Sequence, residues 1–83
     1  MLKHYYKDGA LSIKYKRLMG VTAGIATKCK SCMILDANRA IMAGATKEEV
    51  IEAAAIGIGF GGASAYVLVR NNLLRYLDDM EKD

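Results

Sequence analysis

Proline and tryptophan are absent from this sequence of 83 residues, and histidine occurs once, as His4. Without proline nothing forces a helix to break, and the abundance of alanine favours helices over strands. Two cysteines and one distant histidine fall short of the four ligands of a structural zinc site. We therefore expect no resident metal ion and no cofactor, with a zinc site shared between subunits as the alternative.

Neither a signal peptide nor a membrane span is expected. The first residues contain no apolar stretch, and the longest uncharged run, residues 53–69, has seventeen residues and is interrupted by four glycines. A bilayer requires roughly 20 apolar residues, so we interpret this run as buried core at a subunit contact. We expect a cytoplasmic protein without a membrane or nucleic-acid partner. In a reducing cytoplasm, paired cysteines are more often redox-active or metal-binding than structural.

Acidic residues are scarce in the first part of the chain. Residues 1–30 carry seven Lys or Arg and one acid, Asp8, whereas residues 31–83 carry five Lys or Arg and eight acids. We interpret this basic first part as an ordinary solvated face, and the alternative is that it attracts anionic ligands or acidic protein faces.

The length indicates a single domain, residues 1–83. A chain this short buries only about 60% of the surface that it exposes when unfolded. Because 53% of its residues are hydrophobic, apolar surface is left over for contacts between copies. We predict a small all-α domain that oligomerises to complete its core.

Capping residues locate the helices. Ser12 is suited to begin a first helix that runs to about Thr27, and a second helix is expected from residues 29–31 to residue 43, followed by Gly44 in the left-handed conformation. Thr46 and Glu49 form a capping box, which predicts a third helix to about Ile58.

Four glycines at positions 57, 59, 61 and 62 then predict a break or a close helix crossing before a last helix at 63–79. In that helix Arg70 falls on an apolar stripe with Val67, Leu74 and Leu77, so its stem is expected to pack while its head finds a carboxylate. Three methionines fall at positions that predict core packing: Met19, Met33 and Met42.

The clearest chemical motif is the pair Cys29-Lys-Ser-Cys32. At a helix start this spacing places both sulfurs on one face, close enough to form a disulfide. The helix N-terminus, the flanking Lys28 and Lys30, and the CxxC arrangement all lower the pKa of a thiol. A thiolate attacks disulfides and peroxides. The alternative is that both cysteines are small buried hydrophobes.

Asp36 extends the same helical face, four residues after Cys32. A carboxylate there raises the pKa of a neighbouring thiol by repulsion, and it can also act as a weak proton acceptor.

The chain from about residue 14 to residue 77 resembles the carboxymuconolactone decarboxylase and alkylhydroperoxidase D (AhpD-like) family. The resemblance rests on the Cys29 and Cys32 pair, on residues 43–50 (Ala-Gly-Ala-Thr-Lys-Glu-Glu-Val) and on the glycines of 57–62. It implies an all-α fold with the cysteine pair at a helix start, assembled as a homo-oligomer, often a trimer or a hexamer.

The resemblance also implies a chemistry. In the AhpD-like branch the cysteines reduce peroxides or disulfides, with the counterpart of Cys32 meeting the oxidant and that of Cys29 resolving it. Redox-active members carry a histidine where this chain has Asp36 and a glutamate where it has Arg17. We interpret these two replacements as an ion pair in place of the family's Glu and His.

We therefore predict a thiol-dependent oxidoreductase, an antioxidant peroxidase or disulfide reductase, with Cys29, Cys32 and Asp36 as its site residues and a redox partner protein as one source of electrons. Two alternatives stay open: a non-catalytic oligomeric family member with a degenerate site, and a decarboxylase-type enzyme that acts on a lactone acid.

Overall fold

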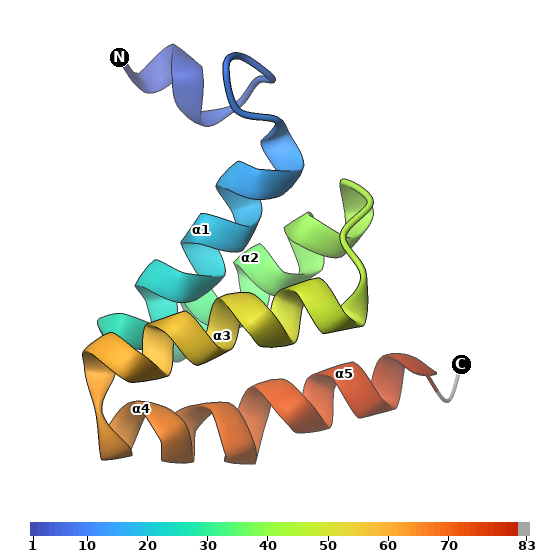
Figure 1. Cartoon of the computed structure of the whole chain (residues 1–83). Coiled ribbons are helices and arrows are strands. Elements are labelled where there is room, and N and C mark those ends of the chain that lie inside the picture. The colour runs from blue at the N-terminus through green and yellow to red at the C-terminus, as the bar shows by residue number, and fades with distance from the viewer. Residues whose placement is uncertain (82–83) are drawn as a thin grey trace.

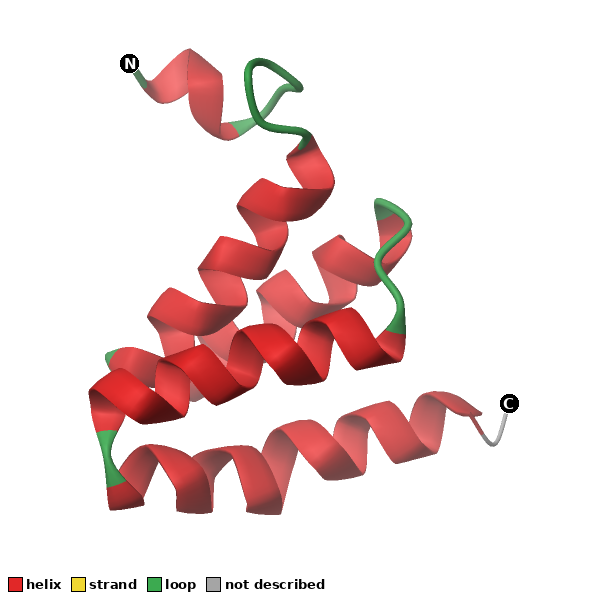
Figure 2. Cartoon of the chain, in the orientation of Figure 1, coloured by secondary structure: helices red, strands yellow, loops and turns green. Residues whose placement is uncertain are grey.

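The structure is a computed structural model that describes residues 1–81, and over this range it contains helices, turns and loops but no strand. The all-α prediction is therefore confirmed (Figures 1 and 2). In chain order the elements are a short 3-10 turn at Leu2–Tyr5, α1 (Ile13–Ala26), α2 (Lys30–Met42), α3 (Lys47–Gly61), α4 (Ala63–Leu68), a π-helical turn (Val69–Leu73) and α5 (Leu74–Glu81).

Side-chain caps begin α1 and α3 at the residues that the sequence indicates. The Ser12 hydroxyl accepts a hydrogen bond from the Tyr15 amide at 3.3 Å. At α3 the Thr46 hydroxyl accepts from the Glu49 amide at 3.1 Å, and the Glu49 carboxylate accepts from the Thr46 amide at 2.9 Å. Both predicted starts are confirmed, because each depends on local hydrogen bonds that are visible in the sequence.

The end of α1 fixes where the cysteine pair begins. Lys28 has φ 58°, in the left-handed region where glycine is usual. Its amide donates to the Ile25 carbonyl at 3.0 Å, and the Cys29 amide donates to the Gly24 carbonyl at 2.7 Å. This pair of bonds is a Schellman motif, which leaves Cys29 between α1 and α2. The predicted left-handed Gly44 after α2 is confirmed, with φ 104°.

Helix α1 is the centre of the packing and contacts both α2 and α3. The C-terminal helical segment turns back at Gly62 and runs beside α3 in the opposite direction (Figure 1). The core is built mainly from the following buried residues: Leu18, Val21, Ile25, Met33, Ala37, Ala40, Val50, Ala54, Ala65, Val69, Leu73 and Leu77.

The glycine cluster breaks the chain only at Gly62, where φ is 81°. Helix α3 therefore continues to Gly61, and the predicted end at Ile58 is wrong by one turn. Gly57 serves a close helix crossing instead, since a Cβ built there would lie 2.8 Å from both the Thr22 carbonyl oxygen and the Ile25 Cβ of α1.

Of the stripe predicted for the last helix, Leu77 is buried as expected, whereas Val67, Arg70 and Leu74 are exposed. The buried residues there are Ala65, Val69, Leu73 and Leu77, whereas Arg70 is exposed and donates to the Asn71 side chain at 3.2 Å. A π-helical turn contains more residues than an α-helical turn. Every fourth residue of this segment therefore stays on the buried face of the helix. A period of 3.6 therefore selects mostly the wrong residues.

Much apolar surface remains exposed on one chain. Met33 is fully buried, but Met19 and Met42 are 50% and 79% exposed, so two of the three predicted core methionines are wrong. The uncharged run of residues 53–69 is only partly buried, because Ile56, Phe60 and two further side chains of α3 and α4 are open to solvent. Among residues 1–81, no helix is both long enough and apolar enough to cross a bilayer.

We predict that Gly57→Ala destabilises the protein by about 1–3 kcal/mol, because the added methyl group overpacks the α1–α3 crossing. Gly59→Ala is the matched control in the same helix. A Cβ at Gly59 meets nothing within 4 Å, so the substitution should stabilise the helix by about 0.5–1 kcal/mol. Urea denaturation measures both values, and equal effects of the two substitutions would contradict this packing.

Glu49 should make stability depend on pH. The Glu49 carboxylate accepts a hydrogen bond from the Thr46 backbone amide, and its Oε2 lies 3.1 Å from Lys14 Nζ. These two contacts hold the pKa of Glu49 below its ordinary value. The resulting stabilisation is complete above the unfolded pKa of about 4.3 and is lost as pH falls through the lower folded pKa. The stability difference between wild type and Glu49→Gln, measured by urea denaturation, should therefore shrink below about pH 4. Glu48→Gln, on the same turn, is the control, and a difference that does not change with pH would contradict the prediction.

Candidate functional site

The two cysteines lie at the start of α2 and are joined by a disulfide, with their Cα atoms 5.3 Å apart. Cys29 is the N-cap residue, and its sulfur accepts the Cys32 amide at 3.3 Å. Cys29 is half-buried, whereas Cys32 is exposed. The flanking Lys28 and Lys30 are exposed as well. Cys32 is therefore the sulfur that an external reagent reaches more easily.

Cys32 and Asp36 line one cavity of about 280 Å³ between α1, α2 and the N-terminal segment. Its remaining walls are Tyr5, Lys16, Gly20, Ala23, Gly24 and Thr27. The structure thus brings together two of the three predicted site residues around one space, while Cys29 closes the disulfide from the helix cap. Among residues 1–81, no group of three His, Cys, Asp or Glu side chains is arranged to hold a metal ion.

Two glycines of α1 make this arrangement possible. A Cβ built at Gly20 would lie 2.1 Å from Asp36 Oδ2, and one built at Gly24 would lie 2.9 Å from the Met33 amide nitrogen and 3.2 Å from the Cys32 Cβ. Only glycine fits at these positions without displacing α2. The sequence reasoning missed their role, although a spacing of four residues places both glycines on one face of α1.

Behind the cavity, Asp36 forms ion pairs with two arginines. Its Oδ1 lies 3.6 Å from Arg17 Nη1 and 3.7 Å from Arg39 Nη1. Arg17 and Asp36 are 5% and 8% exposed, so their pair is buried, and the predicted pairing is confirmed. Within residues 1–81, neither Asp36 Oδ1 nor Arg17 Nε has a hydrogen-bond partner. The involvement of Arg39 was not predicted, although it follows Asp36 by three residues on the same helix.

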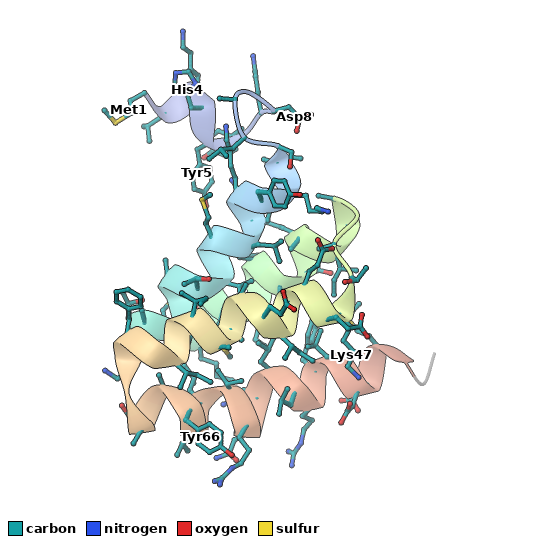
Figure 3. The ribbon with its side chains drawn as sticks, viewed as in Figure 1. Met1, His4, Tyr5, Asp8, Lys47 and Tyr66 are labelled. Carbon is teal, nitrogen blue, oxygen red and sulfur yellow. A yellow bond between two sulfur atoms is a disulfide. The ribbon has the colours of Figure 1, made fainter. Side chains whose placement is uncertain are left out.

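Cations of α1 also hold the N-terminal segment in place. Arg17 Nη2 donates to the Tyr5 carbonyl, and its guanidinium carbon lies 4.1 Å from the centre of the Tyr5 ring. Lys16 donates to the carbonyls of His4 and Lys7. Figure 3 shows Tyr5 and His4 on the segment above α1. These contacts give partners to cations that the dipole of α1 alone would disfavour.

The comparisons with known proteins agree with this geometry. The family model described as the carboxymuconolactone decarboxylase family matches residues 1–71. The chain therefore belongs to the carboxymuconolactone decarboxylase family, as the sequence resemblance predicted.

Similar proteins are found in Thermotoga maritima and Cupriavidus necator. A crystal structure of a family member from Thermotoga maritima, for which a role in the antioxidative response has been suggested, is 33% identical, with a TM-score of 0.82 over 96% of this chain and 84% of that one. A second crystal structure of the same Thermotoga maritima protein gives the same identity and TM-score over 96% of this chain and 72% of that one. An uncharacterised protein of Cupriavidus necator is 28% identical over 78 residues, which are 94% of this chain and 68% of that protein.

We predict that Arg17→Met destabilises the protein by about 3 kcal/mol, because it removes a buried partner of Asp36 and leaves much of that charge uncompensated. Arg39→Met is the matched control, since the Arg39 side chain is 44% exposed and an exposed pair contributes at most about 1 kcal/mol.

Adding Asp36→Asn to Arg17→Met should recover part of the loss, because the uncompensated charge is then removed. Denaturant unfolding of wild type, Arg17→Met, Asp36→Asn and the double variant gives the coupling free energy between Arg17 and Asp36. Strictly additive effects of Arg17→Met and Asp36→Asn would contradict the assignment of a buried ion pair.

Proposed function

We propose that the protein is a thiol-dependent oxidoreductase that reduces peroxides or disulfides by reversible formation of the Cys29–Cys32 disulfide. The observation that carries the proposal is the bonded cysteine pair at the N-terminus of α2, with Cys32 exposed beside a cavity. The antioxidative role suggested for the Thermotoga maritima relative supports the same chemistry.

The first step with a peroxide is attack by the Cys32 thiolate on one peroxide oxygen. A sulfur–oxygen bond forms, the oxygen–oxygen bond breaks, and the leaving alkoxide takes a proton and departs as an alcohol. Cys32 is then a sulfenic acid. The amides at the start of α2 and the nearby Lys28 and Lys30 favour the thiolate that this step needs.

In the second step the Cys29 thiolate attacks the Cys32 sulfur. The disulfide forms as the sulfur–oxygen bond breaks, and hydroxide takes a proton and leaves as water. A disulfide substrate follows the same route through a mixed disulfide and releases two thiols. A dithiol, supplied by a redox partner protein, then returns two electrons and two protons to the pair.

Asp36 is proposed as the proton acceptor for the Cys32 thiol, because both side chains line the same cavity. Arg17 and Arg39 position its carboxylate through their contacts with Oδ1. A carboxylate is a weaker base than the family's histidine at neutral pH, so this relay should be slow.

We further propose that the protein works as a homo-oligomer, a trimer or a hexamer. The support is apolar surface on α3 and α4 that one chain leaves open: Ile56 is 58% exposed, Phe60 83%, Tyr66 51% and Val67 43%. Their burial between copies would remove this surface from water, which is how small chains commonly gain stability.

One observation favours a second candidate function. Arg17 and Asp36 occupy the positions of the family's Glu and His, and they are bound to each other. A non-catalytic oligomeric binding protein on this fold would need only that structural pair. Its cysteines would stay unreactive towards a thiol probe at neutral pH, whereas the oxidoreductase predicts rapid labelling of reduced Cys32.

Substitution of each cysteine tests the proposed chemistry. With cumene hydroperoxide and excess dithiothreitol, Cys32→Ser should lower peroxide consumption at least about 100-fold, since it removes the attacking thiolate. Cys29→Ser should leave a sulfenic acid on Cys32 or a mixed disulfide with dithiothreitol, either of which mass spectrometry detects.

Ser31→Ala is the control within the same motif, since its hydroxyl lies 3.6 Å from the Cys29 sulfur but carries no role in electron transfer. It should retain most of the activity. Activity that is unchanged in both cysteine variants would rule out the proposed function.

A further inference from the structure

A second cleft, of about 390 Å³, lies between the start of α1 and the end of α2. It is lined by Tyr6, Ile13, Arg17, Arg39, Met42 and Ala43, and neither cysteine lines it. Its volume lies within the range of small-molecule sites, roughly 300–1,000 Å³. The cleft is therefore large enough for a ligand of its own.

The cleft carries more positive than negative charge. Two guanidinium groups line it, and both are directed at one carboxylate oxygen, Asp36 Oδ1, at 3.6 Å and 3.7 Å. These separations exceed the roughly 2.7–2.9 Å of charge-assisted hydrogen bonds, so Asp36 does not saturate the donors of the two arginines. The two arginines and Asp36 together carry one net positive charge. Arg39, whose side chain is 44% exposed, offers donors to a second anion, whereas Arg17 is buried and already donates to the Tyr5 carbonyl.

Neighbouring charged groups already have other partners. Lys14 is paired with Glu49 at 3.1 Å. Asp8, the acid nearest in sequence to the cleft, accepts a hydrogen bond from the Ile13 amide at 2.7 Å and so faces the start of α1. Arg17 and Arg39 are the charged side chains that line the cleft itself.

The other side chains of the cleft are mainly apolar. Ile13, Met42 and Ala43 carry no charged or hydrogen-bonding side-chain atom, apart from the weak thioether acceptor of Met42, and Met42 is 79% exposed. Tyr6 adds an aromatic ring with one hydroxyl. A ligand that fits these walls has one anionic head and a mainly apolar body, because a second charged group would meet no charged partner outside the two arginines.

We propose that this cleft binds a small organic monocarboxylate. Its carboxylate would pair with the exposed guanidinium group of Arg39, whose planar fork matches that shape, and the buried guanidinium group of Arg17 would add positive charge behind it. Its apolar body would cover Ile13 and Met42. Neither cysteine belongs to this site, although its two arginines also contact Asp36, which lines the cysteine cavity. Binding at the cleft does not require the proposed redox function.

An NMR titration of ¹⁵N-labelled protein with hexanoate at constant ionic strength tests the proposal. Saturable shifts are expected at the amides of Ile13, Met42 and Ala43. Two further probes test the two halves of the ligand: 1-hexanol has no charge and inorganic phosphate has no apolar body, so each should bind at least about 10-fold more weakly.

Arg39→Gln should weaken hexanoate binding at least about 5-fold. Arg70→Gln is the matched control, because Arg70 is an exposed arginine that does not line the cleft, and it should leave the affinity unchanged. Should Arg39→Gln fail to fold, Met42→Glu, at an exposed position, should abolish binding by placing a carboxylate in the cleft.

The proposal is overturned if hexanoate shows no saturable binding, if its shifts lie away from the cleft, or if the affinity of folded Arg39→Gln equals that of wild type. It is also overturned if hexanol or phosphate binds as tightly as hexanoate, because the ligand would then lack one of its two required parts.

Discussion

Helix α1 lies so close to α2 that Gly20 and Gly24 have no room for a side chain. The rest of the site depends on this close approach. It places the carboxylate of Asp36 over Gly20 and the backbone of Met33 over Gly24, which holds the first turn of α2 and Cys32 against α1. A wider spacing would open the Arg17–Asp36 contact to water and enlarge the cavity beside Cys32.

Asp36 contacts both the cavity beside Cys32 and the arginines of the cleft. It lines the cavity of Cys32, and the two arginines that flank its Oδ1 line the cleft at the far end of α2. Arg17 also holds the Tyr5 carbonyl and ring, and together with Lys16 it keeps the N-terminal segment as a wall of the cysteine cavity. One buried charge therefore organises features that are distant in sequence.

Local signals predicted the helix starts, because the bonds of Ser12 and Thr46 involve neighbouring residues. Complementary charge at two family positions was enough to predict the Arg17–Asp36 pair. The role of Gly20 could not be predicted, since it depends on which helix faces meet. The exposure of Arg70 could not be predicted either. The π-helical turn changes which residues lie on the buried face, and no pattern in the sequence indicates a π-helical turn there. Roles that depend on packing between helices were predicted only where the residue types themselves indicated a contact, as with the charges of Arg17 and Asp36.

The reduction potential of the Cys29–Cys32 couple tests the central claim most directly. It is obtained by equilibrating the protein in dithiothreitol or glutathione buffers and counting alkylated thiols by mass spectrometry. A pair at a helix start with Cys32 exposed should give a two-electron couple between about −270 and −120 mV, as in proteins that exchange disulfides. A potential below about −300 mV, or a dithiol that never closes, would contradict a redox role and leave the cysteines as structural residues.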